Sequence, residues 1–89
     1  MKHFNITISG RVQGVGFRFT AMEAAYRHNI RGFVRNTPDR SVYIEAEGND
    51  PGMELFLQWC RRGPVGAKVT DIEISEGPFV GFTEFAITH

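Results

Sequence analysis

A single cysteine, no long hydrophobic run and no net charge set the first limits on this sequence. One cysteine cannot form an internal disulfide, so nothing calls for an oxidising compartment. No run of 18 apolar residues exists that could form a membrane-spanning helix. Polar residues interrupt the first strand-like segment, so we expect no signal peptide. The 89 residues therefore predict a cytoplasmic protein with one domain over residues 1–89.

The residues that usually bind metals or attack substrates are also scarce. His3, His28 and His89 show no metal-ligand spacing, and no cysteine pair accompanies them. We expect surface or terminal positions for all three histidines, and no metal site. Cys60 lacks the arginine six residues later that a cysteine phosphatase loop needs, because position 66 is glycine. It is expected to be an inert residue of the core.

The net charge of zero hides an asymmetry along the chain. Residues 1–40 hold seven basic and two acidic residues, a net charge of +5, whereas residues 41–89 hold three basic and eight acidic residues, a net charge of −5. A zero total argues against nucleic-acid binding, but a local basic cluster is compatible with a small anionic ligand. Alternatively, strands from both halves interleave in space and the asymmetry averages out.

Alternating apolar and polar residues predict the strands. We expect them over His3–Ser9, Gly32–Asn36, Ser41–Glu47 and Val69–Ser75, with a short last strand around Phe85 and Ile87. The second and third strands form a hairpin through a turn at Thr37–Arg40, with Val42 inward and Glu47 outward. Val69 is out of phase with its strand, which indicates a bulge or an exposed start.

Apolar spacing predicts two helices. The first covers residues 19–28, ends at Asn29, and buries the face formed by Phe19, Met22, Ala25 and Tyr26. The second begins with Asp50 as N-cap and Pro51 as first helical residue, and buries Met53, Phe56, Leu57 and Cys60. The order is β-α-β-β-α-β plus a terminal strand, which is an α+β, ferredoxin-like sandwich. Both helices should cover one face of an antiparallel sheet.

The segment Gly10–Arg18 joins the first strand to the first helix and is rich in glycine. Gly14 and Gly16 permit backbone conformations in which successive N–H groups turn inward as an anion-binding nest. The nest precedes a helix N-terminus, and the Arg18 guanidinium offers a fork of donors that matches phosphate oxygens. The segment therefore predicts a phosphate cradle, although a structural glycine turn beside a surface arginine is the alternative.

Two other phosphate loops are excluded. A Walker loop ends in Gly-Lys-Ser/Thr, and no lysine lies between Lys2 and Lys68. A dinucleotide fingerprint needs a third glycine at position 19, which is phenylalanine.

Two motifs of the sequence resemble the signature motifs of the acylphosphatase family. Gly10–Arg18 matches every position of its pattern G-R-V-Q-G-V-G-F-R, and Gly32–Asn36 matches its second motif, which Val42 and Gly48 continue. The likeness covers essentially the whole chain. One position departs from the pattern, because Arg40 stands where the family has a turn glycine. A left-handed turn there would cost arginine about 1 kcal/mol.

The resemblance implies hydrolysis of acyl phosphates to a carboxylate and inorganic phosphate. Arg18 and the loop N–H groups would hold the phosphoryl group, and Asn36 would orient the attacking water. The loop donors would be the backbone N–H groups of Gln13, Gly14, Val15, Gly16, Phe17 and Arg18. The partners implied are a small-molecule acyl phosphate and its phosphate product, with no cofactor, metal, nucleic acid or membrane, and the protein is expected to be a monomer.

Several neighbours have two open interpretations. Thr37 either supports the site through a hydrogen bond or caps the turn. Thr20 is a helix N-cap or first-turn residue, or else supports the site. Arg11 either adds to the positive field or is simply solvated. Phe17 and Phe19 either shape the rim of the pocket or fill the core.

Two other functions remain open for this order of elements. Ferredoxin-like sheets also bind RNA through aromatic residues on central strands, but Glu45 and Glu47 are unfavourable on such a surface and no RNP1 string is present. The second open function is that of a module that binds phosphate without turning over a substrate. A metal-free hydrolysis assay separates the enzyme from both.

Overall fold

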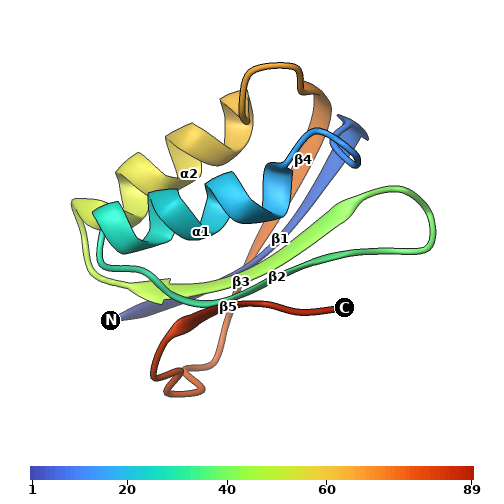
Figure 1. Cartoon of the computed structure of the whole chain (residues 1–89). Helices are drawn as coiled ribbons and strands as arrows, with labels where there is room; N and C mark the ends of the chain where they lie inside the picture. Colours follow the sequence, from blue (N-terminus) through green and yellow to red (C-terminus); the bar gives the residue numbers. More distant parts are fainter.

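Two helices cover one face of a five-stranded sheet in the computed structural model, which describes all 89 residues (Figure 1). The elements are β1 (Lys2–Arg11), α1 (Phe17–Arg27), β2 (Arg31–Asn36), β3 (Val42–Gly48), α2 (Gly52–Arg62), β4 (Lys68–Gly77) and β5 (Phe85–Ile87). The strand order β4-β1-β3-β2-β5 and the shared helix face confirm the predicted sandwich. Neither helix is long and apolar enough to cross a membrane.

The four strands β1 to β4 pair antiparallel, as expected, and the short extra strand β5 makes the sheet mixed. β5 pairs parallel to β2, with Gly32 opposite Phe85 and Val34 opposite Ile87. The chain leaves β4, crosses under the uncovered face of the sheet and enters the free edge of β2 in the same direction as β2 (Figure 1). This path carries the C-terminus to the end of the molecule where α1 begins.

The core lies between the helices and the sheet, as the strand alternation predicts. Its strand side includes Ile6, Ile8, Val34, Val42 and Ile44, all fully buried. From α2 come Met53, Phe56, Trp59 and Cys60, close to the predicted face. Complete burial raises the pKa of the Cys60 thiol, which keeps it protonated and inert.

The predicted buried face of the first helix was wrong. α1 begins at Phe17, two residues earlier than expected, and buries Phe17, Ala21, Ala24 and Ala25. Phe19 and Tyr26 are instead 57% and 59% exposed. The alanines let the helix backbone approach the sheet closely, so the small side chains pack inward and the large ones point outward. The prediction rested on the spacing of the large apolar side chains, and it therefore identified the wrong face of the helix as buried.

The ends of the elements confirm some predictions and correct one. Asn29 has a φ of 59° just after α1, and Arg40 has a φ of 73° in the β2–β3 turn, both in the left-handed region. The register of β1 against β4 shifts between Ser9 and Gly10, opposite Val69, which is the predicted bulge. Asp50 is not the N-cap of α2. Pro51 occupies that position, and the Asp50 carboxylate pairs with Lys2 at 3.6 Å.

A buried carboxylate clamps the segment that crosses under the sheet. Glu47 is 1% exposed, although strand alternation had placed it outward. Its carboxylate accepts hydrogen bonds from the backbone N–H groups of Val80, Gly81 and Phe82 and from Nδ1 of His3, the last at 2.7 Å. The expected surface position of His3 was therefore also wrong, because the crossing segment covers it.

The His3 ring lies between oxygen acceptors on both sides. Its Nδ1 faces Glu47, while its Nε2 lies 3.0 Å from Oδ1 of Asn5 and 3.1 Å from Oε1 of Glu45. Burial alone would lower the pKa of His3, but these partners outweigh it and raise the pKa above 6.5. Burial alone would raise the pKa of Glu47, but the N–H donors and His3 outweigh it and lower the pKa to about 2.

Removing the clamp should lower stability and flatten its dependence on pH. The Glu47 contribution is fully present above pH 4.5 and is lost as the pH falls through about 2. The His3 contribution is fully present below pH 6.5 and is lost as the pH rises through the raised pKa.

Glu47→Gln should therefore lower the free energy of unfolding at pH 6 by about 3 kcal/mol, measured by urea denaturation. The exposed Glu73→Gln is the control. A parallel loss of stability in Glu47→Gln and wild type between pH 4.5 and 2 would contradict the clamp.

Candidate active site

The loop between β1 and α1 has the backbone shape that an anion nest requires. Gly14 and Gly16 have φ values of 75° and 74°. A Cβ at either position would meet no atom within 4 Å, so glycine is favoured there by the left-handed backbone and not by lack of space. Residues 13–16 donate no backbone hydrogen bond within the chain, and the Gly16 N-cap has no side-chain partner. Their N–H groups are therefore free for a ligand at the start of α1.

The Gln13 side chain ties this loop to the β2–β3 turn. Its Nε2 donates to the carbonyl oxygens of Thr37 and Ser41, both at 2.9 Å. Thr37 in turn bonds through its hydroxyl with the Ser41 backbone and the Asp39 carboxylate, so its turn-capping role is confirmed. These contacts hold the loop beside the turn at which β2 ends.

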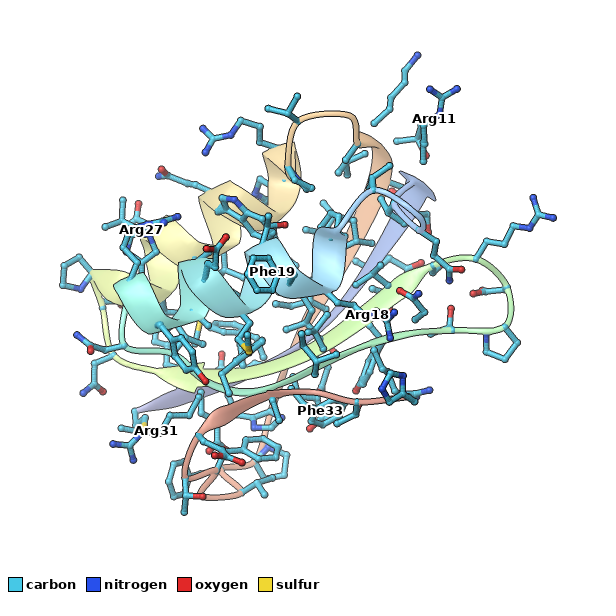
Figure 2. The ribbon with its side chains drawn as sticks, in the orientation of Figure 1. Arg11, Arg18, Phe19, Arg27, Arg31 and Phe33 are labelled. Carbon is cyan, nitrogen blue, oxygen red and sulfur yellow. The ribbon has the colours of Figure 1, made fainter.

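Arg18 lies in the first turn of α1, and its half-buried side chain extends toward the C-terminal strand (Figure 2). Its Nη1 donates to Nδ1 of His89 at 3.2 Å. β5 brings His89 there, because the Thr88 N–H donates to the Val34 carbonyl at 2.9 Å and extends the pairing with β2. No sequence pattern indicates this contact, because it depends on the parallel pairing of β5 with β2.

Asn36 is the last residue of β2, two positions after Val34. Side chains two apart on a strand share a face, so Asn36 lies on the same face as the fully buried Val34, the face that the helices cover. It is half-buried, and its amide takes no part in the side-chain hydrogen bonds of the neighbouring turn, which join Gln13, Thr37, Asp39 and Ser41. The amide is therefore available to a ligand at the end of the sheet where the loop and α1 begin.

The remaining candidate residues separate into structural and solvated groups. Phe17 is 2% exposed and packs edge-on against Trp59, with ring centroids 5.2 Å apart, so it belongs to the core and not to a pocket rim. The Thr20 hydroxyl donates to the Gly16 carbonyl at 2.9 Å, which makes it a first-turn residue and not the N-cap. Arg11 is exposed and points away from Arg18 into solvent (Figure 2), so it does not contact the site directly.

The comparisons with known proteins agree with this geometry. The acylphosphatase family model matches residues 4–87. An acylphosphatase of Methylococcus capsulatus is 43% identical over 88 residues, which cover 98% of this chain and 96% of the relative. An acylphosphatase of Ligilactobacillus salivarius is 42% identical, with 100% of both chains covered. The crystal structure of acylphosphatase from Bacillus subtilis superposes with a TM-score of 0.96 at 36% identity, with 100% of both chains covered. These matches confirm the resemblance seen in the two motifs, and the chain belongs to the acylphosphatase family of hydrolases.

Proposed function

We propose that this protein hydrolyses acyl phosphates, holding the phosphoryl group with Arg18 and the N–H groups of residues 13–18 and orienting the attacking water with Asn36. The observation that carries the proposal is the pair of left-handed glycines, Gly14 and Gly16, which leave the loop N–H groups free directly before Arg18. Free donors, a helix N-terminus and a permanent cation together favour a dianionic phosphoryl group.

This reaction requires the protein mainly to position the reactants and to stabilise the negative charge on the phosphoryl group. Water attacks phosphorus as the bond from phosphorus to the acyl oxygen breaks. The electron pair leaves with the carboxylate, and the water protons pass to the phosphate product and to solvent. Arg18 and the loop donors stabilise the charge on the phosphoryl oxygens, while the oxygen of the Asn36 amide accepts a hydrogen bond from the attacking water and so orients it.

A general acid is unnecessary for this leaving group. A carboxylate has a conjugate acid with a pKa of roughly 4, so it departs without being protonated. An alkoxide from a sugar or serine phosphate would need a proton from the protein. Within this proposal the enzyme is a cytoplasmic monomer that acts on a small molecule. It needs no metal or cofactor, because Arg18 and the loop supply the positive charge.

The decisive assay compares leaving groups in the presence of a metal chelator. Acetyl phosphate should be hydrolysed with competitive inhibition by inorganic phosphate, whereas glycerol phosphate should be hydrolysed at least about 10³-fold more slowly, because no general acid is available. Phosphate binding without turnover of acetyl phosphate would identify a binding module instead. Equal turnover of both substrates would contradict the leaving-group argument.

A further inference from the structure

The fold gathers most of its basic side chains at one end. At this end, the cradle end, β1, β2 and α2 finish while α1, β3 and β4 begin (Figure 1). Seven basic residues lie there with two carboxylates, Asp39 and Asp71, a net charge of +5. These basic residues are Arg11, Arg18, Arg35, Arg40, Arg61, Arg62 and Lys68.

The rest of the molecule carries three basic and eight acidic residues, a net charge of −5. Strands from the two halves do interleave, in the order β4-β1-β3-β2-β5, but the charge does not average out in space. The second half of the chain returns Arg61, Arg62 and Lys68 to the cradle end, while Arg27 and Arg31 of the first half lie at the opposite end (Figure 2). Positive charge is therefore concentrated at the cradle end, and negative charge predominates in the rest of the molecule.

None of the seven cations forms an ion pair. The ion pairs of the structure join Lys2 to Asp50 and His3 to Glu45 and Glu47. Arg11 and Lys68 even stand directly opposite one another in the register of β1 and β4. Like charges in that position destabilise a sheet, so this arrangement does not serve stability. Most of the seven side chains are exposed, and their field therefore extends into solvent in front of the cradle.

We infer that the cradle end steers anionic substrates to the site and favours acyl phosphates whose acyl group carries a further negative charge. The inference rests on the proposed function, because it places the reacting phosphoryl group at this end. A field of one sign raises the local concentration of oppositely charged molecules, and it acts more strongly on a trianion than on a dianion. The second charge would need no dedicated pocket, since several exposed cations lie at the same end of the molecule as the phosphate cradle.

The test compares two substrates and two double variants. Succinyl phosphate and butanoyl phosphate both have a four-carbon acyl group. A carboxylate in succinyl phosphate replaces the terminal methyl group of butanoyl phosphate, so the two differ mainly by one negative charge. Arg11→Gln with Lys68→Gln removes two charges from the cradle end. Arg27→Gln with Arg31→Gln removes two exposed, unpaired charges from the opposite end and is the matched control. None of these four residues belongs to the proposed catalytic machinery.

At about 0.05 M ionic strength, the cradle-end variant should lower kcat/KM about fourfold for succinyl phosphate and about twofold for butanoyl phosphate, with kcat unchanged. The control variant should change either value by less than about 1.5-fold. At 0.5 M salt the variants should equal wild type, because screening removes the field. Equal effects of the two variants, or a loss that persists at 0.5 M salt, would overturn the inference.

A failure of the proposed function would look different. In that case wild type turns over neither substrate, and the same variants are compared by binding of inorganic phosphate at the two salt concentrations. Weaker binding in the cradle-end variant only at low salt would support steering without catalysis. Identical binding in wild type and in both variants would overturn steering as well.

Discussion

Arg18→Lys should lower kcat/KM for acetyl phosphate by at least about 10³-fold while the protein stays folded. An arginine beside a transferring phosphoryl group is worth about 10³–10⁵ in rate. Lysine keeps the charge but is a point donor, so it cannot bind two phosphoryl oxygens with the planar fork of a guanidinium. Arg18 is half-buried and its one side-chain hydrogen bond is to His89, so the free energy of unfolding should change by less than about 1 kcal/mol.

The control for this change is Arg27→Lys, in the last turn of the same helix. It alters the same atoms at the opposite end of α1 and should leave kcat and KM unchanged. Steady-state kinetics and urea denaturation of both variants measure the two effects. Activity of Arg18→Lys within tenfold of wild type would show that bidentate binding by the guanidinium is unnecessary.

Asn36→Ala should separate turnover from phosphate binding. We expect kcat to fall by about 10²-fold, because a misplaced nucleophile costs about that much, while the inhibition constant of inorganic phosphate changes by less than about threefold. The phosphate is held by Arg18 and the loop donors, which the substitution leaves in place. The Asn36 amide takes no part in the side-chain hydrogen bonds that hold the β2–β3 turn, so its loss should not unfold β2.

Asn49→Ala, in an exposed turn at the other end of the molecule, is the matched control and should behave as wild type. If Asn36→Ala retained wild-type kcat, the amide would not position the water. If kcat and phosphate affinity fell together by similar factors, Asn36 would be a phosphate ligand and the proposed division of roles would be wrong.

The sequence predicts features that depend on local chemistry. Strand alternation in β1 and β3 identifies the core residues, and the left-handed positions of Asn29 and Arg40 follow from the cap and turn in which they lie. The glycine pattern around Gly14 and Gly16 likewise indicates the backbone conformation of the loop, because few other residues adopt positive φ without strain.

Features that depend on distant pairing could not be predicted in this way. His3 and Glu47 look like solvent-facing strand residues until residues 80–82 fold beneath them and supply N–H donors. The contact of His89 with Arg18 needs the parallel pairing of β5 with β2. The inward face of α1 was missed because its alanines carry little apolar signal, although they are what lets the helix approach the sheet.

A crystal structure with bound inorganic phosphate would show directly whether the loop and Arg18 form a phosphate cradle. We expect phosphate oxygens within hydrogen-bond distance of N–H groups of residues 13–18 and of two guanidinium nitrogens of Arg18, with the Asn36 amide facing the side from which water attacks. An unoccupied loop, with phosphate bound elsewhere and the Arg18 guanidinium directed into solvent, would contradict this expectation.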